Sequence, residues 1–180
     1  TYLVPHMTVR IEVMGLATRA ASAAEIARMR QLVAQGMAEG AVGLSTGLNY
    51  WPCTSASTDE LIALCEPLPN YRGVYVTHLR DYRAHIVQAL EEAIGIGETV
   101  GIPVHVSHLN HRADVVAPVI DSGRARGVDI TFDLYPYLAG CTSLAQSLPT
   151  WIRVGSVAET MDFLRKPATQ ERVKAEIEAG

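Results

Sequence analysis

Hydrophobic positions along this chain recur at two spacings, which predict strands that alternate with helices. Short apolar stretches predict five strands, near residues 8–14, 41–47, 73–79, 103–109 and 128–134. The first of them alternates hydrophobic and polar residues from Met7 to Met14. Every interval between strands is long enough for a crossover helix, so we expect a parallel α/β sheet, either open or closed into a barrel.

The intervals between the strands have the spacing and the end signals of helices. Ser22 is followed three residues later by Glu25, which is a capping box, and an apolar stripe then continues to Met37. Ser57 or Thr58 is predicted to cap a helix that ends near Glu66. Further helices are predicted over Arg83–Val100, over His111–Arg126, and on either side of Pro167 within Ser156–Gly180.

Two of the strands are near copies of each other, and each ends in histidine. Gly73–Asp81 (GVYVTHLRD) and Pro103–Asn110 (PVHVSHLN) share the pattern Val-x-Val-x-His-Leu. A strand–helix–strand unit makes them parallel neighbours. Side-chain alternation then predicts that His78 and His108 share one face, with the preceding valines, at the carboxyl ends of the strands. His105 has the opposite phase and is expected to face the helices.

Two imidazoles at neighbouring strand ends indicate a divalent metal site, most often a zinc site. The alternative is that each histidine is a structural residue with one hydrogen-bond partner. Cys53 lies in a loop after a strand, on the same side, and is a further candidate ligand, although a buried thiol is favoured. His6 and His85 carry no signal for a site, and His111 is expected to be solvated.

Two carboxylates lie close to the histidine strands and are candidates for catalysis. Asp81 is expected either to orient an imidazole or to pair with Arg80 or Arg83. Asp133, near the end of the last strand, is either a barrel carboxylate or a structural hydrogen-bonding group. Tyr135 at that strand end is a candidate substrate contact. Arg80 is another, for a carboxylate, with an ion pair as the alternative.

Composition narrows the classes of function. The net charge of −4 and the absence of a basic cluster argue against a nucleic-acid surface. No apolar run is long enough to cross a bilayer. The three cysteines form no CxxC pair, which favours a reducing, cytoplasmic setting. The only lysines, Lys166 and Lys174, lie far from the strand ends, which excludes Schiff-base chemistry and a carbamylated lysine that bridges metals.

Several motifs in one order resemble the N-acyl-D-amino-acid deacylases of the amidohydrolase superfamily. They are GLSTGL, THLRD, SHLN and DLYPYLAG, with a trailing Pro-Ala-Thr, and they extend from about Val9 to the end of the chain. The resemblance implies a metal-dependent (β/α)8 barrel that hydrolyses the amide of N-acyl-D-amino acids. By the same likeness, the five strands correspond to barrel strands three to seven, over residues 1–140. Residues 141–180 then form a helical insertion or connection after the seventh strand.

The resemblance assigns roles residue by residue. It implies that His78 and His108 are zinc ligands, for one or two ions, and that Tyr135 contacts substrate. Asn110 stands where the family has a lysine and is a further candidate substrate contact. The family's amino-terminal His-x-His, its bridging cysteine, its catalytic aspartate and its carboxylate-binding arginine have no counterpart in these residues. A small-molecule substrate is the expected partner.

Two other functions remain open at this stage. One is hydrolysis of cyclic amides by an enzyme of the same superfamily. The other is a non-catalytic partial barrel with an incomplete metal site. Because a (β/α)8 barrel takes about 250 residues, five strands are expected to leave open edges. The chain is therefore expected to be part of a longer polypeptide or to self-associate through those edges, with little activity alone.

Overall fold

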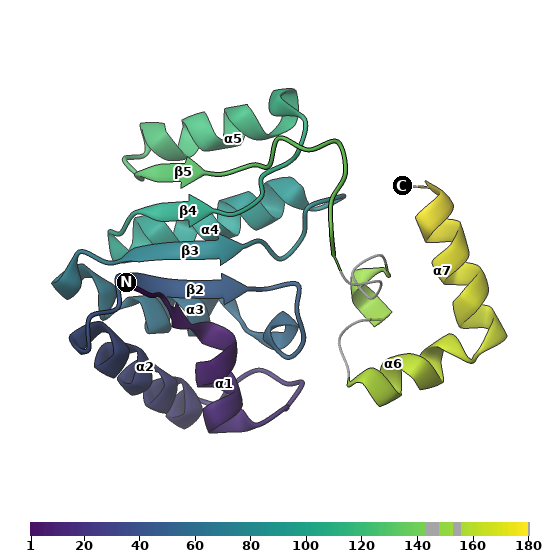
Figure 1. The fold of residues 1–180 in the computed structure, drawn as a ribbon, viewed down its shortest axis with the longest axis horizontal. Helices are drawn as coiled ribbons and strands as arrows, with labels where there is room; N and C mark the ends of the chain where they lie inside the picture. The colour runs from purple at the N-terminus through teal and green to yellow at the C-terminus, as the bar shows by residue number, and fades with distance from the viewer. Residues whose placement is uncertain (143–147, 153–155, 180) are drawn as a thin grey trace.

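The computed structural model describes residues 1–142, 148–152 and 156–179, and it has one parallel sheet in the order β1-β2-β3-β4-β5 (Figure 1). All four pairs of neighbouring strands run parallel, which confirms the predicted class of fold. The strands are β1 Val4–Pro5, β2 Gly43–Gly47, β3 Val74–His78, β4 Val104–Val106 and β5 Ile130–Phe132. The helices are α1 His6–Met14, α2 Ala23–Ala38, α3 Thr58–Cys65, α4 Ile86–Val100, α5 Ala113–Ala125, α6 Val157–Leu164 and α7 Pro167–Ala179. Short 3-10 turns cover Cys53–Ser55, Leu68–Tyr71 and Thr150–Ile152.

The whole of the first predicted strand is helical. The alternating residues 8–14 lie in α1, and β1 is only Val4–Pro5. His6 and Arg10, one turn apart on α1, are both fully buried against Glu60 of α3. The prediction was wrong because the inner face of this helix is fixed by a buried ion cluster of His6, Arg10 and Glu60. A pattern of hydrophobic alternation contains no information about such a cluster.

The helix starts read from the sequence are largely confirmed. Ser22 and Glu25 form the capping box of α2, and the side chain of Ser57 accepts the backbone N–H of Glu60 at the start of α3. The two helices predicted on either side of Pro167 are present as α6 and α7, and Pro167 is the first residue of α7. Gly180, the last residue of the predicted segment, lies outside the described residues.

One face of the sheet carries the hydrophobic core. Four buried residues of this face lie in register in one row across the strands: Leu44, Tyr75, Val104 and Ile130. Gly97 lets α4 approach the sheet closely, because a Cβ there would lie 2.4 Å from Cγ2 of Val104. The next row faces the other way and consists of Ser45, Val76, His105 and Thr131. These side chains are only partly buried or exposed, so this face of the sheet is open.

The register between β3 and β4 is shifted by one residue from the alignment of their two similar sequences. Val76 lies opposite His105, not opposite Val106. A shift of one residue exchanges the two faces of a strand. His105 therefore shares the open face with Val76, and the prediction that it faces the helices was wrong. The predicted common face for the valines of both strands was wrong for the same reason, since Val104 packs against α4.

The carboxyl-terminal helices lie beyond the carboxyl ends of the strands. In Figure 1 the strand arrows point toward the side of the molecule that holds α6 and α7. The carboxyl ends of the strands, where the two histidines lie, therefore face α7.

The described part of the chain has no helix that is both long and apolar enough to span a bilayer.

Candidate metal centre and substrate cleft

The two predicted ligand histidines lie side by side at the carboxyl ends of β3 and β4. Their ring centroids are 5.8 Å apart. His78 ends β3 on the open face, whereas His108 follows β4 and has a φ of 56°. Strand phase alone would direct His108 to the helix side, but this left-handed backbone turns its ring back toward His78. The predicted proximity of the two rings is confirmed, but it depends on the backbone conformation at His108 and not on side-chain alternation along the strand.

An acceptor oxygen lies beside Nδ1 of each imidazole. Nδ1 of His78 lies 3.4 Å from the carbonyl oxygen of Leu79, which can only accept a hydrogen bond. Nδ1 of His108 lies 3.4 Å from Oδ1 of Asp133. Each arrangement favours a hydrogen on Nδ1 and leaves the lone pair on Nε2, the form in which a histidine binds a metal. The pair is therefore suited to contribute two nitrogen ligands.

Two histidines are only part of a metal-ligand set. Zinc sites in enzymes use three protein ligands and a water molecule. Within residues 1–142, 148–152 and 156–179, no group of three or more His, Cys, Asp or Glu side chains is arranged to hold an ion. Cys53 is fully buried, and desolvation raises the pKa of its thiol to about 12. The structure thus fits the favoured prediction of a buried thiol at Cys53, and metal binding by His78 and His108 stays a prediction.

Three tyrosine rings surround the histidine pair. Tyr50 and Tyr82 pack edge-on against His78, with centroids at 5.0 Å and 4.7 Å. The ring of Tyr135 lies 5.5 Å from that of His108. The hydroxyl of Tyr50 is 3.4 Å from Nε2 of His78. Tyr135 therefore lies where the sequence predicted it, beside the candidate metal centre.

Asp133 connects the histidine of β4 with the one that follows it. Its carboxylate accepts the backbone N–H of His108 at 2.8 Å and contacts Nε2 of His105 at 3.0 Å. Desolvation opposes ionisation of Asp133. The hydrogen bonds from His108 and His105 outweigh it and lower the pKa of the carboxyl group. Of the two roles predicted for Asp133, these contacts favour the structural one, in which it orients His108.

The carboxylate of Asp81 forms hydrogen bonds with the backbone just before α4. Its Oδ1 accepts the N–H groups of Arg83 at 2.6 Å and of His85 at 3.3 Å. Neither the predicted contact with an imidazole nor the predicted ion pair with Arg80 or Arg83 is formed by Asp81 among the described residues. Catalysis by Asp81 stays a prediction, and its contacts with the N–H groups of Arg83 and His85 are those of a turn residue.

The guanidinium of Arg80 is held between two segments of the chain. It donates to both carboxylate oxygens of Glu92, at 3.0 Å and 2.9 Å, and to the carbonyl oxygens of Thr54 and Ala56. This is the ion-pair alternative, although the partner is Glu92 on α4 and not a neighbouring carboxylate. Arg80 also lines the cleft described below, so substrate contact by this residue stays a prediction.

Asn110 holds the backbone of Tyr135. Its side-chain amide donates to the Tyr135 carbonyl oxygen at 3.2 Å, and its oxygen accepts the Tyr135 N–H at 3.3 Å. The two contacts tie the loop after β4 to the loop after β5. Contact between Asn110 and substrate stays a prediction, whereas its contact with the segment that carries Tyr135 is present in the structure.

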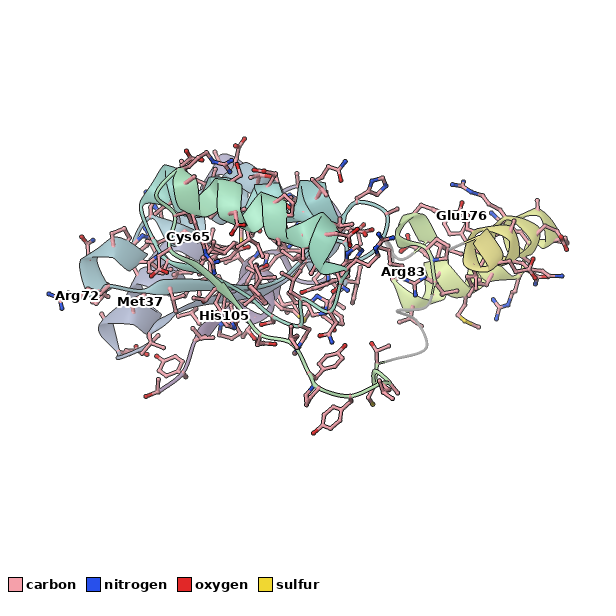
Figure 2. All side chains as sticks on the ribbon, turned by 90° about the horizontal axis from the view of Figure 1, so that it is seen from above. Met37, Cys65, Arg72, Arg83, His105 and Glu176 are labelled. Carbon is pink, nitrogen blue, oxygen red and sulfur yellow. The ribbon has the colours of Figure 1, made fainter. Side chains whose placement is uncertain are left out.

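A cleft of about 520 Å³ opens beside His78 and is bounded on the far side by the segment around Trp151 and by α7. Tyr50, Tyr82 and Arg83 line one side, and Trp151 and α7 line the other. Figure 2 shows Arg83 at the end of the α/β part that is nearest to the helix carrying Glu176. The indole N–H of Trp151 donates to Glu176 at 2.9 Å, and the guanidinium of Arg172 lies 4.0 Å from a ring centroid of Trp151.

Sequence reasoning missed two features of this end of the molecule. Tyr50 and Tyr82 were not singled out, although both follow strand ends in the sequence, which was a usable signal. The buried ion cluster of His6, Arg10 and Glu60 was also missed. Its members are far apart in the sequence, so no local pattern reveals them.

No family model matches the chain. It is 44% identical over 151 residues to the D-aminoacylase of Alcaligenes xylosoxydans xylosoxydans, covering 80% of this chain and 31% of that protein. A solved D-aminoacylase with a binuclear metal centre is 43% identical, with a TM-score of 0.71 over 75% of this chain and 30% of that one. The N-acyl-D-glutamate deacylase of Bordetella bronchiseptica, solved with zinc and a phosphonate inhibitor, is 32% identical over the same shares, also with a TM-score of 0.71. The chain thus spans about a third of the length of these relatives.

Proposed function

We propose that this chain, which belongs to the N-acyl-D-amino-acid deacylases and so to the amidohydrolases, forms part of a zinc-dependent enzyme that hydrolyses the amide bond of N-acyl-D-amino acids. One observation carries the proposal. The imidazoles of His78 and His108 lie 5.8 Å apart at neighbouring strand ends, and an acceptor oxygen lies beside Nδ1 of each. The sequence identity of 44% to a D-aminoacylase supports the reaction class.

In this proposal the histidine pair supplies two ligands, and Asp133 holds His108 in its ligating orientation. When bound, zinc polarises the amide carbonyl and lowers the pKa of a coordinated water to about 7. Tyr135 is proposed to contact substrate and not metal, because its ring borders His108 while its backbone is held by Asn110. The cleft beside His78 is proposed to hold the substrate.

We propose that polypeptide outside these 180 residues completes the site. Two observations support this part of the proposal: the described residues contain no cluster of three ligands, and the chain spans about 31% of a related D-aminoacylase. In this proposal residues 1–140 form the central strands of a barrel and residues 141–180 the helical segment that follows, of which 143–147, 153–155 and 180 lie outside the described residues. A cytoplasmic location is proposed from the free cysteines Cys53, Cys65 and Cys141.

Zinc content and stereospecific hydrolysis test the proposal together. The full-length protein that contains this sequence should bind zinc and hydrolyse N-acyl-D-amino acids in preference to their L forms. His78→Ala and His108→Ala should each lower the zinc content and abolish hydrolysis, while far-UV circular dichroism is retained.

The outcomes separate the alternatives that the sequence left open. Zinc-dependent cleavage of cyclic amides, with acyl-D-amino acids untouched, would show an enzyme of another specificity. A protein that binds no zinc and hydrolyses neither class would contradict the proposal and favour a non-catalytic partial barrel.

A further inference from the structure

The strand ends that carry the histidine pair are joined by a side chain instead of by the backbone. In a parallel pair, backbone hydrogen bonds run alternately from one strand to the other at every second residue. Between β3 and β4 the amide of Tyr75 donates to the Pro103 carbonyl oxygen at 3.0 Å, and the amide of Ser107 donates to the Thr77 carbonyl oxygen at 2.9 Å. The next bond in this series would run from the amide of Leu79 to the carbonyl oxygen of Ser107.

The hydroxyl of Tyr82 occupies the place of that next bond. It accepts the backbone N–H of Leu79 at 2.9 Å and donates to the Ser107 carbonyl oxygen. Both backbone groups are therefore satisfied, but through an inserted oxygen atom that lies between the strands. Leu79 directly follows His78, and Ser107 directly precedes His108, so the insertion lies between the two histidines.

The ring of Tyr82 fixes the same place from the side. It packs edge-on against the imidazole of His78 with centroids 4.7 Å apart, and it contacts the hydrophobic core. Tyr50 also packs against His78, but its hydroxyl reaches that imidazole and not the backbone of β4. Tyr82 thus contacts both strand ends through its hydroxyl.

We propose that Tyr82 is a positioning residue that sets the separation of His78 and His108, by holding the ends of β3 and β4 apart with one hydroxyl group. A direct backbone bond would bring these strand ends together. The inserted hydroxyl spaces them and fixes the spacing. Its consequence for metal binding rests on the proposed function, whereas the spacing itself does not.

The spacing is tested by nuclear magnetic resonance on the metal-free protein. Tyr82→Phe keeps the ring and removes the hydroxyl. Tyr75→Phe is the matched control, because it removes another buried hydroxyl from β3, one that lies 3.0 Å from Thr46 Oγ1 on the face of the sheet opposite to His78. The wild-type protein and Tyr75→Phe should show cross-relaxation between the ring protons of His78 and His108.

The expected result for Tyr82→Phe is that this cross-relaxation changes several-fold and that amide exchange at Leu79 accelerates about tenfold. Both effects should be specific to Tyr82→Phe after correction for global stability measured by denaturant unfolding. Unchanged cross-relaxation and unchanged Leu79 protection in Tyr82→Phe would overturn the proposal. Equal changes in both variants would also overturn it, since they would report a general loosening of the sheet.

A zinc titration separates this inference from the proposed function. If the wild-type protein binds zinc through the pair, Tyr82→Phe should bind it about tenfold more weakly, whereas Tyr75→Phe should match the wild type. If His78→Ala and His108→Ala bind zinc as well as the wild type does, the proposed metal site fails. The cross-relaxation measurement still decides whether Tyr82 sets the spacing.

Discussion

Two of the contacts between histidine and carboxylate in the described part of the chain have opposite surroundings. His6 lies 2.9 Å from Glu60, and both side chains are completely buried. His108 lies 3.4 Å from Asp133, and about half of each side chain is exposed. The residue types and distances are similar, so proximity alone does not distinguish a structural contact from one that serves a site.

The surroundings of each contact show what it can do. In the buried ion cluster, Arg10 adds a second bond to Glu60, so the carboxylate is enclosed by its partners and closed to ligands. At the strand ends, Asp133 occupies one edge of His108 and leaves the other edge toward His78. We therefore interpret the first contact as part of the fold and the second as support for a binding site.

The largest expected effect comes from the buried ion cluster. Glu60→Ala leaves Arg10 buried without a counter-charge, and breaking a buried pair from one side costs about 3–5 kcal/mol. Denaturant unfolding should show this loss. Arg30→Ala is the control, because Arg30 pairs with Glu66 while both are about half exposed, and such pairs contribute about 0–1 kcal/mol. Equal losses in the two variants would remove the distinction between buried and exposed contacts.

Lowering the pH should weaken the contact of Glu60 with His6 and Arg10. Desolvation opposes ionisation of Glu60, but hydrogen bonds from His6 and Arg10 outweigh it and lower its pKa. The contribution of Glu60 is therefore complete above its unfolded pKa of about 4.3 and is lost as the pH falls through the lower folded value. Between these values the wild type should lose stability more steeply than Glu60→Gln, as measured by denaturant unfolding at several pH values. Parallel pH profiles would contradict this account.

A smaller effect on stability, but a clear effect on metal binding, is expected at the exposed contact. Asp133→Asn keeps the shape of the side chain and removes the charge beside His108. The free energy of unfolding should change by less than about 1 kcal/mol, since the pair is half exposed. Zinc affinity should fall about tenfold, because the imidazole loses its orienting carboxylate. Wild-type zinc affinity in Asp133→Asn would show that Asp133 does not support the site.

The smallest effect on both stability and zinc content is expected for Tyr135→Phe. The phenol is partly exposed and lies beside His108 without a role as ligand in this account. Zinc content should stay at the wild-type level, and kcat/KM for an N-acyl-D-amino acid should fall about tenfold, mainly through KM. Loss of zinc from Tyr135→Phe would mean that Tyr135 binds metal, and the open site would then have a further ligand.

Most of the fold could be predicted because its elements have local signals. The capping box at Ser22 and Glu25, and the two apolar strands that end in histidine, placed helices and strands correctly. The error over residues 8–14 has a physical cause: alternation is blind to an ion cluster whose partner, Glu60, comes fifty residues later. Contacts between distant residues decide such a segment, and local periodicity does not contain them.

The site could be predicted in outline but not in detail. The repeated pattern was enough to bring His78 and His108 together, because parallel strands align their carboxyl ends. The register between the strands and the left-handed backbone at His108 could not be read from the pattern. Nor could the insertion of the Tyr82 hydroxyl, since it depends on where the backbone of β4 ends.

X-ray absorption at the zinc edge tests the central claim most directly. The zinc-loaded full-length protein should show imidazole scattering from nitrogen ligands at about 2.0–2.1 Å. The account predicts that the His78→Ala, His108→Ala double variant, if it retains any zinc, loses the scattering of two imidazoles. A double variant with full zinc content and an unchanged spectrum would contradict the account, because the histidine pair would then not be part of the metal centre.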